Sequence, residues 1–78
     1  MSTTYDRLVT IVTELHDSPP DRIGPQATFA GLDVDSLTMV EIGIHIERAL
    51  GIALTDDELR EDLTLDATAR LIDAKRAR

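Results

Sequence analysis

The chain has 78 residues, enough for one small hydrophobic core, so we expect a single domain (residues 1–78) without a deep active-site cleft. It has no cysteine, which excludes disulfides and thiolate metal sites, and only two aromatic residues, so its core must be aliphatic. The net charge is −7, and residues 31–62 account for the whole excess, with nine acidic and two basic residues. Such a surface should repel nucleic acid, and it serves either basic protein partners or solubility alone.

The first predicted element is an amphipathic helix that starts at Thr3 or Thr4, since either hydroxyl can cap it. Its apolar residues recur at three- and four-residue spacing and form one face: Tyr5, Leu8, Ile11, Val12 and Leu15. The helix should end at Asp17-Ser18-Pro19-Pro20, because proline lacks the amide donor that a helix needs.

A long connection follows and runs to about Asp35. A loop of this length without structure of its own is unusual in a compact domain and often functional. It contains three apolar residues that we expect to anchor it across the helices: Ile23, Phe29 and Leu32.

The second predicted helix runs from Ser36 to Leu50, with Asp35 as its N-cap and Gly51 at its C-terminal end. One side of this helix is apolar enough to be the core face: Met39, Ile42, Ile46, Ala49 and Leu50. A second apolar stripe, rotated well away from the first, consists of Leu37, Val40 and Ile44. Charged and polar residues flank this stripe: Ser36 and Glu47 on one side, Glu41 and Arg48 on the other.

A helix in a small bundle needs only one buried face, so we interpret the second stripe as a docking surface for partner proteins. The alternative is that the stripe packs beneath the third helix or the long loop. For Ile44 both interpretations stand.

Two further helices are predicted after Gly51. The segment Thr55-Asp56-Asp57-Glu58 has the spacing of a capping box and predicts a short third helix. Thr64 can cap a fourth helix, in which Leu65, Ala69 and Ile72 form a narrow apolar stripe. The predicted fold is all-α: a small four-helix bundle of three main helices and the short third helix, with a long loop between the first two.

Ser36 stands where a helix starts, and the unpaired amides and the dipole of a helix start favour a negatively charged phosphate. A serine in this position is by itself usually only a capping residue. The segment from Gly31 to Ile42, however, places Asp35-Ser36-Leu37 at the start of an amphipathic helix. In an acidic chain with four predicted helices, this segment resembles the attachment site of acyl carrier proteins. The resemblance covers essentially the whole chain.

The resemblance implies that a phosphopantetheinyl transferase uses coenzyme A to attach 4′-phosphopantetheine to Ser36. The thiol of this arm would hold an acyl group as a thioester, which suits a chain without cysteine. The protein would not be an enzyme, and we expect neither catalytic residues nor a metal site. Asp35 would orient the loop or assist the encounter with the transferase.

The resemblance also assigns residues to partner recognition: Leu37, Val40, Glu41, Ile44 and Glu47. The expected partners are the transferase, and acyltransferases, ketosynthases or acyl-loading enzymes with basic docking surfaces. Their contacts should be weak and sensitive to salt, as a shuttle requires. No apolar run approaches the roughly 20 residues that span a membrane, and no secretory signal precedes the first helix, so we expect a cytoplasmic monomer that binds no membrane.

Four positions depart from the pattern of primary fatty-acid carriers: Asp33, where a glycine is usual, Gly43, Arg48 and Asp62. These departures favour a discrete carrier of a specialised pathway, such as polyketide synthesis. Glycine inside a helix costs about 1 kcal/mol relative to alanine, so Gly43 needs a reason. Our hypothesis is that it leaves room for the arm or the acyl chain; the alternatives are close packing against the long loop near Phe29, or drift.

Other interpretations remain open. A peptidyl, aminoacyl or aryl carrier would share the fold and the arm but would be loaded by an adenylation enzyme. An unmodified acidic helical interaction module would need no arm on Ser36. A small hydrolase would use Ser36 with His16 or His45, although the chain lacks a Gly-x-Ser-x-Gly elbow. A calcium site at Asp33-Val34-Asp35 is not supported, because the following residues depart from the EF-hand spacing.

Overall fold

The computed structural model describes residues 3–77, so three residues of the predicted domain lie outside the description. It contains three α-helices in chain order: α1 (Thr4–Leu15), α2 (Ser36–Leu50) and α3 (Leu65–Arg76). A single turn of 3₁₀-helix, η1 (Pro20–Arg22), interrupts the connection between α1 and α2. Within residues 3–77 there is no strand, and β-pairing is limited to one isolated bridge between Thr28 and Thr64. The predicted all-α fold is confirmed, with three main helices.

The helix starts lie where the capping residues predicted them. Thr3 caps α1 in a capping box, in which the Asp6 amide donates to Thr3 Oγ1 (3.1 Å) and the Thr3 amide donates to the Asp6 carboxylate (3.2 Å). The hydroxyl of Thr64 accepts the Ala67 amide (3.0 Å) and caps α3. Helix α2 ends at Gly51, which takes the left-handed conformation (φ 72°) that favours glycine.

The predicted short helix at Thr55 is wrong. The backbone makes only one turn there, in which the amides of Glu58 (3.0 Å) and Leu59 (2.9 Å) donate to Thr55 O. The carbonyl of Glu61 then accepts the amide of Ala30 (2.9 Å) in the long loop. An isolated turn of helix is marginal in water, and here a backbone bond to a distant segment takes the place of further helical bonds.

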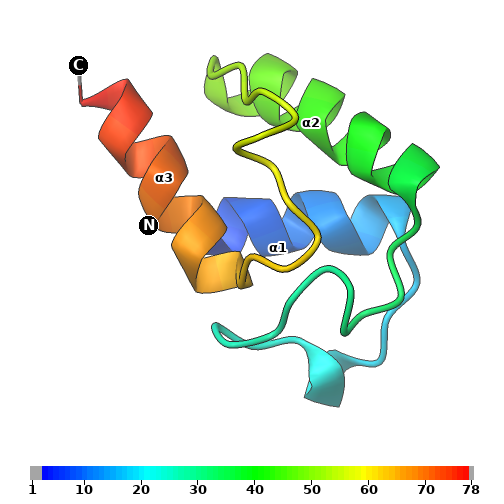
Figure 1. Ribbon diagram of the computed structural model, residues 1–78. Helices are drawn as coiled ribbons and strands as arrows, with labels where there is room; N and C mark the ends of the chain where they lie inside the picture. Colours follow the sequence, from blue (N-terminus) through cyan, green and yellow to red (C-terminus); the bar gives the residue numbers. More distant parts are fainter. Residues whose placement is uncertain (1–2, 78) are drawn as a thin grey trace.

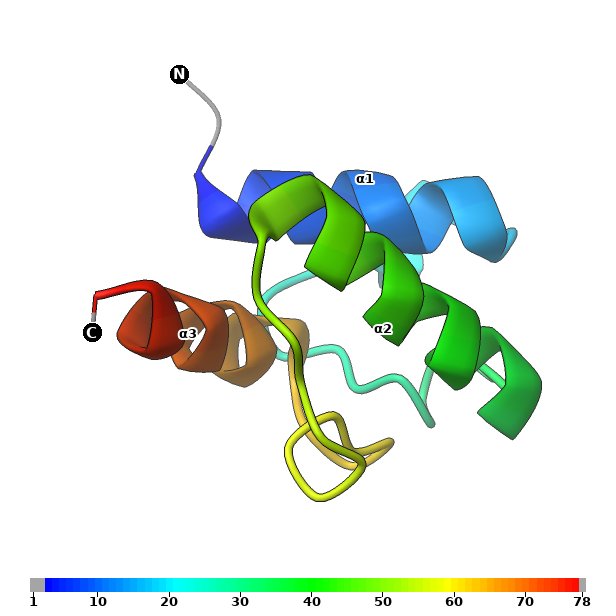
Figure 2. The ribbon, with the colours of Figure 1, turned by 90° about the horizontal axis from the view of Figure 1, so that it is seen from above.

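Helix α1 is the common packing partner of the other two helices, whereas the backbones of α2 and α3 do not approach each other closely. Both views show the connection of residues 51–64 running between α2 and α3 (Figures 1 and 2). One hydrophobic core, aliphatic apart from Phe29, joins the three helices and the long loop, and its buried members are Leu8, Ile11, Val12, Phe29, Leu32, Val34, Met39, Ile42, Ile46, Leu50, Leu65, Ala69 and Ile72. Ala49, which was predicted on the core face, is exposed, because it lies at the edge of that face near the end of α2.

The long loop is anchored as predicted, by the fully buried Phe29 and the buried Leu32, while Ile23 is only partly buried. Its backbone also pairs with α3. The carbonyl of Ala27 accepts the Leu65 amide (2.8 Å), and the carbonyl of Pro25 accepts the Asp66 amide (3.0 Å). These bonds satisfy amides that the first turn of a helix otherwise leaves free. The loop is therefore part of the core and not a loose linker.

The anchoring of the loop predicts the effect of replacing Phe29. Phe29→Ala should lower the free energy of unfolding by about 3–5 kcal/mol, because a fully buried aromatic side chain leaves a cavity that the small core cannot close. Urea unfolding followed by circular dichroism measures the change. Leu37→Ala is the matched control, since Leu37 is 69% exposed and its loss should change the free energy of unfolding by no more than about 0.5 kcal/mol. Equal losses in both variants would contradict the assignment of Phe29 as the anchor.

Candidate functional site

Ser36 is the first residue of α2, and its side chain is exposed. Asp35, directly before it, is the N-cap: its carboxylate accepts the amide of Thr38 (2.8 Å). Ser36 therefore lies at the N-terminal end of a fifteen-residue helix, next to its first backbone amides. This arrangement suits a phosphate ester on the serine oxygen, because the N-terminal end of a helix stabilises negative charge.

The backbone that leads to Ser36 is held from two sides. His16, at the end of α1, donates from Nε2 to the carbonyl of Leu32 (2.7 Å). The guanidinium of Arg22 donates to the carbonyl of Gly31 and lies 3.6 Å from the carboxylate of Asp33. Both side chains therefore fix the loop just before the helix start. Sequence reasoning missed these two contacts, since neither residue lies near Ser36 in the chain.

Asp33 takes a left-handed conformation, with φ of 61°. Aspartate tolerates this conformation better than most residues other than glycine and asparagine. The departure from glycine at this position thus has a structural explanation: the turn requires a positive φ, and aspartate supplies it while pairing with Arg22.

The pKa of Asp35 is lowered from its ordinary value, chiefly because its carboxylate accepts the backbone amide of Thr38. A hydrogen bond from the Thr38 side chain and the nearby His16 lower this pKa further. Asp35 is therefore an ionised capping residue at neutral pH. Within residues 3–77 no hydrogen bond joins Ser36 to His16 or His45, and the ring of His16 is already engaged by Leu32, which gives no support to the hydrolase interpretation.

The second apolar stripe of α2 is exposed, as the docking interpretation requires. Leu37 is 69% exposed, Val40 58% and Ile44 43%, so the stripe does not pack beneath another element. Glu41, Glu47 and Arg48 are exposed beside it. The five residues predicted for partner recognition thus lie on the surface of one helix that starts at Ser36.

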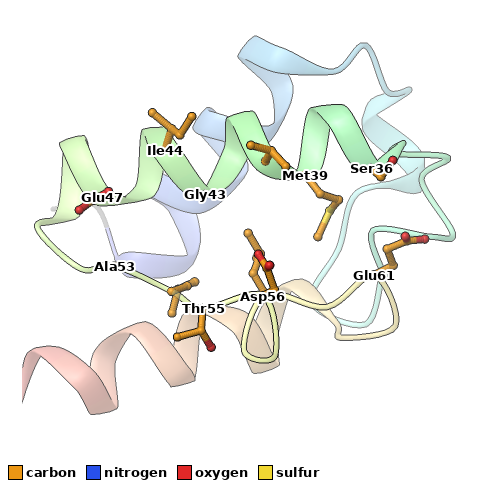
Figure 3. Close-up of a pocket in the computed structure, with 12 residues that line it drawn as sticks. Ser36, Met39, Gly43, Ile44, Glu47, Ala53, Thr55, Asp56 and Glu61 are labelled. Carbon is orange, nitrogen blue, oxygen red and sulfur yellow. The ribbon is translucent and has the colours of Figure 1, made fainter.

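A cavity of about 440 Å³ lies between α2 and the connection of residues 51–64 (Figure 3). Its lining comes from both elements: Ser36, Met39, Val40, Gly43, Ile44, Glu47, Ala53, Leu54, Thr55, Asp56, Leu59 and Glu61. Gly43 lies in its wall, where an added Cβ would come within 3.3 Å of Leu59 Cδ2. Gly43 therefore packs against the connection of residues 51–64, which we call the second connection, and not against the long loop near Phe29.

Sequence reasoning did not find the residues that the second connection contributes to this cavity. A glycine in the interior of α2 was the one signal in the sequence that pointed to this cavity.

Within the described residues no group of three or more histidine, aspartate or glutamate side chains is arranged to hold a metal ion. None of the helices in residues 3–77 combines the length and the apolarity that crossing a membrane demands.

A protein-family model described as "phosphopantetheine attachment site" matches residues 6–72, most of the chain. An acyl carrier protein from Thermobifida fusca is 35% identical over 57 residues, which cover 72% of each protein. The chain belongs to the acyl carrier protein family. Members of this family carry 4′-phosphopantetheine and are carriers rather than enzymes. They interact with phosphopantetheinyl transferases and with biosynthetic enzymes.

Other relatives match shorter parts of longer proteins. An acyl carrier protein from Acidothermus cellulolyticus is 37% identical over 54 residues, which cover 68% of this carrier and 64% of the relative. A meromycolate extension acyl carrier protein from Mycolicibacterium aurum is 36% identical over 53 residues, which cover 67% of this carrier and 55% of the relative. The carrier thus spans less than two thirds of the length of these two relatives.

The lowered pKa of Asp35 predicts a pH dependence of stability. The ionised cap stabilises the fold above the ordinary aspartate pKa of about 3.9, and this contribution is lost as the pH falls through the lower pKa of the folded state. Asp35→Asn keeps a capping side chain without the charge. The wild type should therefore exceed Asp35→Asn in stability at neutral pH, and the difference should shrink below about pH 4.

Thermal unfolding at several pH values measures this difference. Asp21→Asn serves as the control, because Asp21 is an exposed carboxylate elsewhere in the carrier. A difference between wild type and Asp35→Asn that stayed constant from neutral to acidic pH would show that the charge of Asp35 does not act as a cap.

Proposed function

We propose that the carrier holds acyl intermediates as thioesters on 4′-phosphopantetheine attached to Ser36 Oγ. The observation that supports this assignment most directly is the position of Ser36: it is exposed, it is the first residue of α2, and it lines the cavity. The bound arm supplies a thiol, which the chain itself lacks because it contains no cysteine.

The surroundings of Ser36 fit this role. The start of α2 favours the phosphate electrostatically, while Asp35 turns its carboxylate back onto the Thr38 amide. The contacts of His16 with Leu32 and of Arg22 with Gly31 hold the preceding loop, so a transferase meets a preformed site. The adjoining cavity offers the acyl chain an environment partly screened from water.

The docking surface supports the choice of partners. The exposed stripe of Leu37, Val40 and Ile44 offers an apolar contact, and the carboxylates of Glu41 and Glu47 offer charge. A complementary partner surface carries apolar and basic side chains, as we propose for the phosphopantetheinyl transferase and for acyltransferases, ketosynthases or acyl-loading enzymes. Exposed charge pairs are screened by salt and chiefly affect the rate of association, which suits a carrier that must leave each partner.

The proposed pathway is a specialised one in the cytoplasm, such as polyketide synthesis. The support comes from the departures at Asp33, Gly43, Arg48 and Asp62. Of these, Asp33 pairs with Arg22, Gly43 faces Leu59 and Asp62 pairs with Arg60. A carrier of aminoacyl, peptidyl or aryl groups is the second candidate. Loading trials with malonyl, acetyl and aminoacyl donors and the cognate enzymes distinguish the two.

Attachment at Ser36 is tested by intact mass. After incubation with coenzyme A and a broad-specificity phosphopantetheinyl transferase, the wild type should gain the mass of one phosphopantetheine group, and Ser36→Ala should gain none. The helical circular dichroism of Ser36→Ala should stay close to that of the wild type, since Ser36 is exposed. Modification of Ser36→Ala would disprove the assignment, and so would a wild type that never gains mass.

The docking proposal is tested by reversing one charge. Glu41→Lys should slow modification by the transferase several-fold at low salt, because the carboxylate that attracts a basic surface becomes a like charge. The melting temperature is the measure of folding, and it should change little because Glu41 is exposed. Asp21→Lys is the matched control, since it makes the same charge change on another element. A loss of rate that simply followed a loss of melting temperature would show that Glu41 is only structural.

A further inference from the structure

The cavity beside α2 has a lining of mixed character. Most of its apolar surface comes from aliphatic side chains on both walls: Met39, Val40, Ile44, Leu54 and Leu59. Three acidic residues, Glu47, Asp56 and Glu61, also line it, together with Ser36 and Thr55, and all five are exposed. No basic side chain contributes to this lining.

The three carboxylates are not neutralised by ion pairs. Among residues 3–77 the four ion pairs join Arg22 with Asp33, Arg60 with Asp62, Arg70 with Asp66, and Lys75 with Glu58. None of them includes a carboxylate of the cavity. Arg60, next to Glu61, is engaged by Asp62 (2.8 Å), and Arg48, next to Glu47, is exposed and does not line the cavity. The lining therefore carries three formal negative charges and no positive one.

The negative charge is spread along the cavity. Ser36 and Glu61 lie toward one end of the cavity, Glu47 and Ala53 toward the other, and Asp56 between them (Figure 3). Ser36 and Glu47 are eleven positions apart in α2, which corresponds to about 16 Å along a helix. A flexible chain that enters from either end therefore meets an unpaired carboxylate.

We propose that this cavity selects among acyl groups by charge. It shelters acyl chains whose far end carries a cationic group, such as an amine, and it leaves chains that end in a carboxylate in solvent. The aliphatic lining binds the methylene groups of either chain, so the carboxylates decide between the two. This inference rests on the proposed attachment at Ser36, and it names the class of cargo that the carrier holds best.

The test compares three acyl groups of matched length on the intact carrier. A broad-specificity transferase loads the wild type from the coenzyme A thioesters of hexanoate, 6-(trimethylammonio)hexanoate and adipate. The quaternary ammonium group keeps its positive charge and cannot attack the thioester. Intact mass first confirms loading and then follows thioester hydrolysis in mildly alkaline buffer. Each rate is divided by that of the same acyl group on free pantetheine, which removes the intrinsic reactivity of the thioester.

The protection measured in this way should be greatest for the cationic chain, intermediate for the neutral chain and least for the carboxylate chain. We expect about a tenfold ratio between the two extremes at low salt, reduced at high salt because exposed carboxylates are screened. In the double variant Glu47→Gln, Asp56→Asn the ratio should fall to about twofold. The double variant Asp17→Asn, Asp21→Asn removes the same charge from the long loop between α1 and α2, outside the cavity, and should keep the wild-type ratio.

Each other result overturns the inference. Equal protection of all three chains, or no protection of any, would show that the cavity does not select cargo by charge. An unchanged ratio in the cavity variant, or an equal loss in the control variant, would assign the preference to the net charge of the carrier. A wild type that gains no mass would instead refute attachment at Ser36, and the inference would fall with it. The loading step therefore separates failure of the proposed function from failure of the charge selection.

Discussion

The backbones of α2 and α3 both lie close to α1 and stay apart from each other, and the rest of the structure depends on this arrangement. Two helices that share one partner leave a gap, and here the connection of residues 51–64 runs through it (Figure 2). The connection fills only part of that gap. Leu59 reaches the wall of α2 at Gly43, and the cavity remains beside this contact. A Cβ at position 43 would lie 3.3 Å from Leu59 Cδ2, so glycine at this position lets the connection pack closely against α2.

The connection keeps its place through bonds to both neighbouring segments. The backbone carbonyl of Glu61 accepts the amide of Ala30 in the long loop, while Lys75 of α3 donates to the carbonyl of Ala53 (2.9 Å) and to the carboxylate of Glu58 (2.6 Å). The bond from Lys75 is the main reason that the pKa of Glu58 is lowered. These contacts explain how a segment without a helix can still form a defined wall of the cavity.

Helix α2 combines three tasks because its residues face different directions. Met39, Ile42 and Ile46 are buried in the core, whereas Leu37 remains in solvent and Val40, also exposed, borders the cavity. Its first residue, Ser36, stands at the helix end where a phosphate is favoured. An arm attached there would therefore have the docking surface and the cavity on the same helix, so a partner bound to α2 would lie close to the cargo.

The sequence by itself determined what depends on residues close together in the chain. The caps Asp35 and Thr64 act over three residues, and the exposure of Leu37 and Val40 follows from helical periodicity, so these features were predicted correctly. The structure decides for Thr3 over Thr4 as the first cap and shows that Ile44 is exposed. The wrong prediction at Thr55 concerns a position where tertiary contacts decide, whereas Ala49 was misplaced because it lies at the edge of its helix face. The cavity, the partner of Gly43 and the contacts of His16 and Arg22 likewise join segments far apart in the sequence. Only the tertiary structure settles these features, because a local pattern specifies which turn a segment can form but not which distant group will take its hydrogen bonds.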